Sequence, residues 1–72
     1  MPPVMREVYS TSVSRIGYDA QTKDLHVVWK GDKASVYTGV PPSVADEVMN
    51  SWSVGKAVRE TVIGNYEHRY LA

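Results

Sequence analysis

Serine and histidine side chains have the clearest potential for chemistry in this sequence. A serine becomes a nucleophile when a neighbouring histidine takes its proton and an acid orients that histidine, or when a Gly-x-Ser-x-Gly turn exposes it. No such turn surrounds any serine of the chain, and no motif links either histidine to an acid. The serines are Ser10, Ser12, Ser14, Ser35, Ser43, Ser51 and Ser53. We therefore expect that the protein is not an enzyme.

Ligands for metals and phosphate groups are equally sparse. His26 and His68 are too few and too far apart in the sequence to predict a zinc site, and cysteine is absent. Gly55-Lys56 resembles part of a phosphate-binding loop, but the first glycine and the hydroxyl residue after the lysine are missing. The sequence therefore predicts neither a metal nor any other cofactor.

Length and composition are typical of one small folded domain. The 72 residues, of which 43% are hydrophobic, suffice for a single core, so we assign residues 1–72 to one domain. The lack of cysteine fits a reducing compartment, and no stretch is typical of a signal peptide or a membrane span. We expect a cytoplasmic protein. The 8 basic residues balance the 8 acidic ones, which disfavours nucleic acid as the primary partner.

Alternating residues predict three strands, at positions 12–19, 25–30 and 34–40. Lys30-Gly31-Asp32-Lys33 supplies turn chemistry between the second and third strands, and an antiparallel meander is the simplest topology. The side chains expected to face the core are Ile16, Tyr18, Leu25, Val27, Trp29 and Val36. Those expected on the open, solvated face are Val13, Arg15, His26, Val28, Lys30 and Tyr37.

Two consecutive prolines, Pro41 and Pro42, end the predicted sheet. The first forces the preceding residue into an extended conformation and the second lacks the N–H donor that a strand needs. Ser43 is expected to cap a helix that follows. Helical spacing places three apolar side chains on one stripe that covers the sheet; they are Val44, Val48 and Trp52.

A second short helix is predicted after Ser53, and Gly64 provides its end. The predicted fold class is therefore α+β, with a three-stranded antiparallel β-meander followed by two short helices packed on one face. Trp29 and Trp52 bring large apolar areas to a small core, so we expect both to be buried and Trp52→Ala to unfold the domain. Residues 1–10 and 65–72 are candidates for flexible tails.

The order of these segments resembles the KTSC domain, a small family named from the tail of some lysyl-tRNA synthetases and common as stand-alone proteins in bacteria and phages. The residues that carry the resemblance are Ile16-Gly17-Tyr18-Asp19, Leu25 to Trp29, Val36 to Pro41, and Ser53-Val54-Gly55-Lys56. The match spans most of the chain. The chain departs from the family at Ala57-Val58, where an aromatic residue is usual, and in the turn before the third strand.

As a stand-alone copy of the domain with extra residues at each end, this sequence also resembles a small lytic-phage protein that binds the bacterial RNA polymerase of its host. This resemblance implies a phage-encoded transcription regulator, active in the host cytoplasm and free of catalysis. It would dock on a large polymerase subunit, and inhibit initiation by interfering with sigma-factor engagement or alter termination. We expect a monomer when free. The alternative, suggested by the synthetase context of the family, is an RNA- or tRNA-binding accessory domain.

The two chain ends are the preferred candidate for the partner-binding surface. They interleave apolar, aromatic and charged side chains, whereas frayed tails are normally poor in such residues. Arginine and aromatic residues are enriched where protein partners bury surface, and an extended end can add a strand to a partner. These terminal residues are Val4, Met5, Arg6, Glu7, Tyr9, His68, Arg69 and Tyr70. The open alternative is that both ends only pack on the domain or fray.

The open face of the sheet is the second candidate. It would combine cations with one aromatic ring, which could stack a base or bind an acidic protein surface. Its residues are Arg15, His26, Lys30 and Tyr37. Open antiparallel sheets ordinarily carry cations on their wet face, so a solvated surface is the simpler interpretation.

Overall fold

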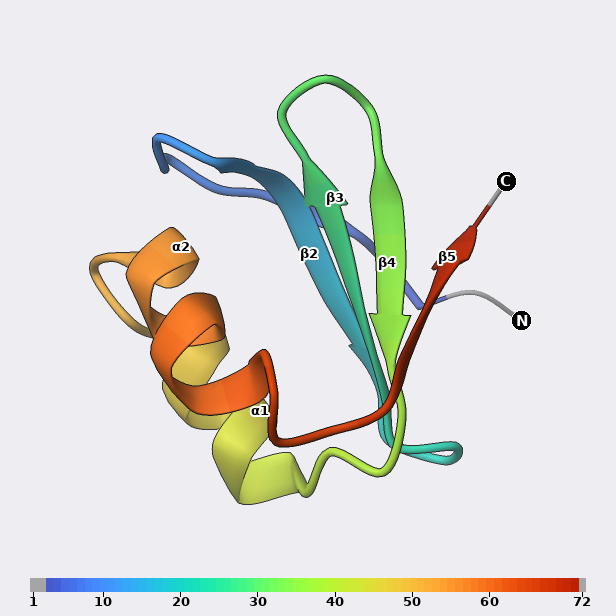
Figure 1. The fold of residues 1–72 in the computed structure, drawn as a ribbon. Coiled ribbons are helices and arrows are strands. Elements are labelled where there is room, and N and C mark those ends of the chain that lie inside the picture. Colours follow the sequence, from blue (N-terminus) through green and yellow to red (C-terminus); the bar gives the residue numbers. More distant parts are fainter. Residues whose placement is uncertain (1–2, 72) are drawn as a thin grey trace.

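The structure is a computed structural model that describes residues 3–71. Within these residues, five strands form one antiparallel sheet whose spatial order follows the chain, and helical segments lie on one of its faces (Figure 1). The strands are β1 (Arg6–Glu7), β2 (Val13–Asp19), β3 (Asp24–Trp29), β4 (Ala34–Tyr37) and β5 (His68–Leu71). The helical segments are α1 (Pro42–Met49), α2 (Val54–Ala57) and the π-helical η1 (Val58–Val62), which continues α2.

The predicted meander is present as β2, β3 and β4, but three strands are too few. The chain ends add β1, with Arg6 opposite Ile16 on β2, and β5, with Leu71 opposite Ala34 on β4. β1 has only two residues, and every residue of β5 is exposed. Neither strand therefore shows the alternation that reveals a strand with one buried face. The chain ends that were candidates for flexible tails thus contain the two edge strands of the sheet, β1 and β5. Residues 1, 2 and 72 lie outside the residues that the structure describes.

The double proline ends the sheet and begins α1. Pro41 is extended and forms the N-cap, and Pro42 takes the first helical position, where a missing N–H leaves no hydrogen bond unmade. The carbonyl of Pro41 accepts the N–H of Ala45 at 3.0 Å. Ser43 is therefore not the cap, since the helix begins before it and Ser43 lies in the first turn. The hydroxyl of Tyr18 donates to the carbonyl of Val40 and fastens the bend to β2.

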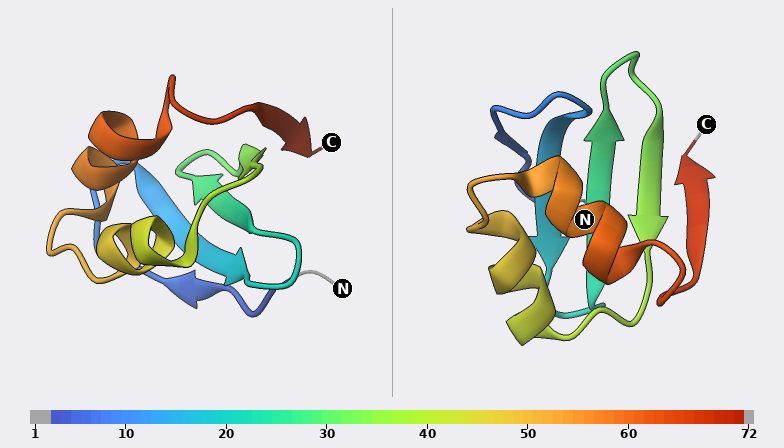
Figure 2. Two further views of the ribbon diagram at one scale, coloured as in Figure 1. Left: turned by 90° about the horizontal axis from the view of Figure 1, so that it is seen from below. Right: turned by 60° about the vertical axis from the view of Figure 1, so that its left-hand side comes forward.

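A valine-rich core fills the space between the sheet and the helices, which form two layers (Figure 2). Its buried residues are Val13, Ile16, Leu25, Val27, Tyr37, Val40, Ala45, Val48, Val54, Val58 and Val62. Val13 was expected on the open face. The register shifts between Val13 and Arg15, because two steps along β2 match one step from Trp29 to Val28 on β3. Such a bulge changes the face on which the following residues point.

In the third predicted strand, the residue expected to face the core and the residue expected to face solvent are exchanged. Tyr37 lies directly opposite Leu25 and belongs to the helix-side core, whereas Val36 lies opposite His26 on the other face. Val36 is nevertheless fully buried. The second face of the sheet is therefore covered at its centre rather than uniformly wet. Close approach by the N-terminal segment contributes, because Val4 and Met5 pack over Gly17, the residue opposite His26.

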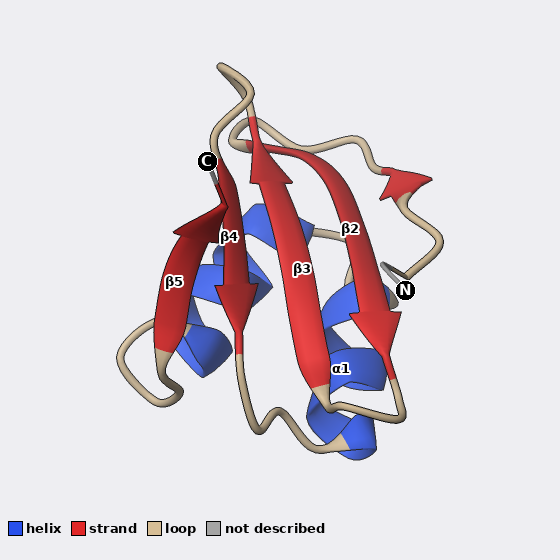
Figure 3. Cartoon of the chain, turned by 90° about the vertical axis from the view of Figure 1, so that its right-hand side faces the viewer, coloured by secondary structure: helices blue, strands red, loops and turns tan. Residues whose placement is uncertain are grey.

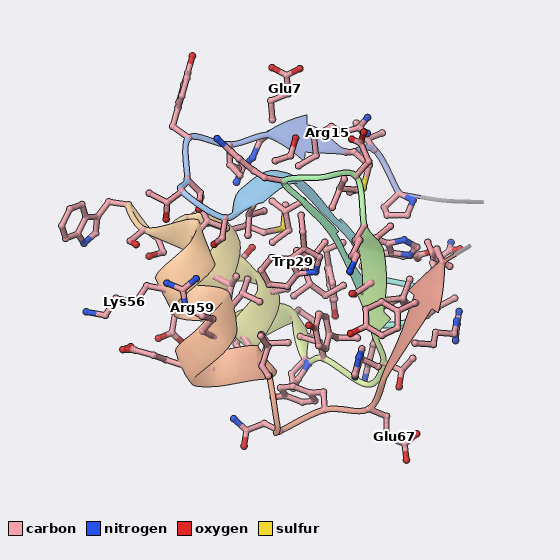
Figure 4. All side chains as sticks on the ribbon, turned by 45° about the horizontal axis from the view of Figure 1, so that its top comes forward. Glu7, Arg15, Trp29, Lys56, Arg59 and Glu67 are labelled. Atoms are coloured by element: carbon pink, nitrogen blue, oxygen red, sulfur yellow. The ribbon has the colours of Figure 1, made fainter. Side chains whose placement is uncertain are left out.

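Trp52 is not a core residue. Its side chain is 97% exposed, whereas Val48 is fully buried. The expected helical stripe ends early because α1 stops at Met49 and Trp52 lies in the loop before α2. Trp29 is half-buried between the two layers (Figure 4), and its indole N–H donates to the hydroxyl of Ser35 at 3.2 Å.

Candidate functional site

The structure places the terminal residues on opposite edges of the sheet. β1 lies next to β2, β5 lies next to β4, and β3 is the central strand (Figure 3). β1 and β5, which carry part of the N-terminal and C-terminal candidates, are therefore separated by three strands. Each edge is a separate candidate for partner binding.

The N-terminal edge combines exposed side chains with anchored ones. Val4 and Tyr9 are exposed, Tyr9 completely so. Met5 is half-buried over Gly17, and the guanidinium of Arg6 donates a hydrogen bond to the main-chain carbonyl of Met49. Arg6 therefore has a structural role at the end of α1. Glu7 points outward from the same edge (Figure 4).

The C-terminal edge is held by a cluster of three aromatic rings, which we call the β5 cluster: Tyr37, His68 and Tyr70. The imidazole of His68 stacks on Tyr37 with ring centroids 5.4 Å apart, and Tyr70 meets His68 edge-on at 5.1 Å. Burial raises the pKa of the Tyr37 hydroxyl above its ordinary value. These contacts attach β5 to β4, and the Tyr70 ring remains largely exposed.

The sheet-face residues do not come together on an open surface. Tyr37 lies on the helix side and is buried, so the expected aromatic platform is missing from the open face. Arg15 is exposed and lies opposite Glu7, while Lys30 belongs to the turn after β3. His26 is half-buried, and desolvation lowers the pKa of its imidazole. Lys30 lines a surface hollow of about 390 Å³ together with Glu7 and the exposed Tyr9, so a cation and a ring lie near this edge of the sheet, although Tyr37 does not.

Trp52 is the exposed feature that sequence reasoning missed. It borders two surface hollows, one between α1 and the α2–η1 segment and one between β1 and the end of α1. The first, which we call the Trp52 hollow, has a volume of about 270 Å³ and is lined by Glu47, Ser51, Trp52, Ser53, Lys56, Ala57, Glu60 and Thr61. The second, of about 380 Å³, is lined by Arg6, Glu7, Val8, Tyr9, Met49, Asn50, Ser51, Trp52 and Val54. The predicted start of a second helix after Ser53 was the sequence signal that the first helix could end before Trp52 and leave its indole exposed.

Gly55 of the Ser53 to Lys56 motif has a packing role. A Cβ placed on it would lie 2.5 Å from the hydroxyl oxygen of Ser12 and 2.7 Å from that of Ser10. One turn later, the guanidinium of Arg59 donates to the same Ser12 hydroxyl at 2.9 Å. The glycine thus allows α2 to approach the segment before β2 closely, which accounts for it without a bound phosphate.

Exposed aromatic rings beside charged side chains are the main candidate binding features of the described residues. Within residues 3–71, no group of three acidic, histidine or cysteine side chains is placed to hold a metal ion. No helix in the same range has the length and apolar character to cross a membrane. Exposed tryptophan and tyrosine beside charged side chains are typical of surfaces that bind proteins.

Comparisons with known proteins agree with this fold. A family model described as the KTSC domain matches residues 9–66. The crystal structure of a KTSC domain protein from Yersinia pestis is similar, with a TM-score of 0.93 and 22% sequence identity. The similarity covers 99% of this chain and 100% of that protein. No curated protein matches the sequence.

Proposed function

The chain belongs to the KTSC domain family, and we propose that this member is a non-catalytic adaptor that binds bacterial RNA polymerase and regulates transcription. Exposure of the Trp52 indole is the observation that carries the adaptor role. Tryptophan is enriched among the residues that dominate binding energy at protein interfaces, and its large apolar ring gains from leaving water. Tyr9, which borders the neighbouring hollow, adds a second exposed ring.

Polymerase as the partner rests on the resemblance of this chain to a lytic-phage protein that binds the polymerase of its host. The proposed mechanism is occlusion. A domain with extents of 28 × 26 × 23 Å docks on a large polymerase subunit and obstructs sigma-factor engagement, or it alters termination. Steric competition requires no reacting group, which is consistent with a surface that offers apolar rings and charges.

Affinity capture tests the proposal. The tagged chain is incubated with purified bacterial RNA polymerase, and the retained subunits are quantified alongside transcription from a sigma-dependent promoter. We expect the wild-type chain to retain polymerase and to lower transcription. Trp52→Ala should weaken both effects, whereas Ile63→Ala, a change at an exposed apolar residue outside both hollows, should not. A wild-type chain that retains no polymerase would overturn the proposed function.

RNA or tRNA binding is less well supported. Its expected stacking residue, Tyr37, is buried, although the exposed Tyr9 ring lines a surface hollow together with Lys30. Counterion release makes RNA binding weaken steeply with salt. Salt-sensitive RNA binding that is lost in a double variant, Arg15→Ala with Lys30→Ala, would favour this alternative over polymerase capture.

A further inference from the structure

The Trp52 hollow places an exposed indole among carboxylates. Glu47 and Glu60 both line it, against a single cation, Lys56. The ammonium of Lys56 lies 4.0 Å from a carboxylate oxygen of Glu60 and offsets its charge. Within residues 3–71, Glu47 makes no ion pair. The hollow therefore has an excess of negative charge that a cation from outside can balance.

The end of α1, which lies beside Trp52, shows that a guanidinium can bind in this part of the molecule. The last carbonyls of a helix carry partial negative charge and favour cations nearby, and the last turn of α1 contains no basic residue. The molecule already contains one example of this preference, because the guanidinium of Arg6 donates to the carbonyl of Met49. Trp52 follows that carbonyl by three positions and borders the hollow that Arg6 also lines.

We propose that the Trp52 hollow receives an arginine side chain of the protein partner. Its guanidinium stacks on the Trp52 indole and donates hydrogen bonds to the carboxylate of Glu47 or Glu60. Tryptophan is the strongest aromatic partner for a cation, and a planar guanidinium can stack on a ring while it donates to a carboxylate. This inference rests on the proposed function only in that it requires a protein partner.

The charge of the hollow fits this occupant better than others. Its carboxylates repel the phosphates of nucleic acids. A lysine side chain would pair with the same carboxylates, but its compact ammonium lacks the flat surface that stacks on an indole.

NMR titration tests the arginine preference directly. The probe is arginine blocked at both ends, with equally blocked lysine as the comparison. The two indole N–H signals separate the sites, because the Trp29 indole donates to Ser35 and serves as an internal reference. We expect arginine to shift the Trp52 signal several times more than lysine does and to leave the Trp29 signal in place. The shift should decrease several-fold in the double variant Glu47→Gln with Glu60→Gln.

The same double variant links the hollow to polymerase. Its capture of polymerase should be about tenfold weaker than that of the wild type or more, as for a central interface residue. The inference would be overturned if the variant bound polymerase as well as the wild type does and arginine caused no shift. The proposed function would then remain intact. An arginine-induced shift in a chain that binds no polymerase would support the inference and overturn the proposed partner. Self-association or RNA binding through Trp52 would overturn the inference.

Discussion

The imidazole of His68 stacks on the ring of Tyr37, and the two residues lie directly opposite each other on β5 and β4. The pair connects an exposed edge strand to a buried residue of the core. The sequence had suggested two separate surfaces, one at the chain ends with His68 and one on the sheet with Tyr37. In the structure these two residues contact each other, and this contact anchors β5 to the domain.

His68→Ala should loosen β5 without unfolding the domain. Stacked and edge-on aromatic pairs contribute about 0.5–1.5 kcal/mol each, and β5 is otherwise exposed. Amide hydrogen exchange of residues 69–71 should accelerate by roughly two- to tenfold, while the amides of β3 keep their protection. Arg69→Ala, a change on the opposite face of the same strand, is the matched control. Unchanged exchange in His68→Ala would show that the backbone hydrogen bonds alone hold β5.

Val48→Ala should destabilise the domain far more than Trp52→Ala. Val48, a residue of α1, is fully buried in the core, so its truncation leaves a cavity and should lower the free energy of unfolding by roughly 2 kcal/mol. Trp52 is 97% exposed, and its replacement should change that free energy by less than about 0.5 kcal/mol. Urea denaturation of both variants gives the comparison. A large loss in Trp52→Ala would mean that the indole packs on the domain in solution.

The helix that contains Val48 shows how far sequence periodicity extends. The double proline and the spacing of the valines predicted α1, because one apolar stripe must cover the sheet. The same spacing grouped Trp52 with Val48, since a period describes which residues share a face only while the helix continues. α1 ends at Met49, and the order of apolar residues alone does not determine where a helix stops.

The sheet has a similar limit. Alternation predicted its three central strands, whose faces differ in burial, but Val36 and Tyr37 are both apolar enough to be buried on either face. The face each occupies is set by the register with β3, which is a long-range property. The candidate site suffered from the same ambiguity. The sequence shows charged and aromatic residues at both ends, but which of their rings remain exposed depends on what packs over them.

Gly17→Ala should displace the N-terminal segment from the sheet. A Cβ at this position would lie 2.7 Å from both the sulfur of Met5 and the carbonyl oxygen of Val4. A flexible methionine can move aside, but the backbone carbonyl can move only if the segment shifts. Overpacking of this kind costs about 1–3 kcal/mol. The free energy of unfolding in urea should fall accordingly, and the amide signals of residues 4–7 should shift.

Truncation of the methionine provides the control for that prediction. Met5→Ala alone removes the sulfur and leaves the carbonyl of Val4 in place. If the backbone contact dominates, the double variant Gly17→Ala with Met5→Ala should remain less stable than Met5→Ala. Full recovery in the double variant would show that the sulfur was the only obstacle, and that the backbone of Val4 lies further from the sheet.

His26 should lower the stability of the domain as the pH falls through the ordinary histidine pKa of 6.5. Desolvation by burial lowers the pKa of its imidazole below the ordinary value of 6.5. Between the two values, the unfolded chain binds more protons than the folded chain, so the free energy of unfolding falls as the pH falls. Above the unfolded pKa the imidazole is neutral in both states and the stability is complete. Below the folded pKa it is protonated in both states and the lost stability does not return.

Urea denaturation at pH 7.5, 6.5, 5.5 and 5.0 measures this dependence. His26→Gln preserves a polar side chain of similar size but removes the titration, so its stability should vary less over the same range. The difference between the two curves isolates the imidazole. If the slope is equal in His26→Gln and the wild type, another group titrates there, and the imidazole of His26 is as accessible to water in the folded chain as in the unfolded one.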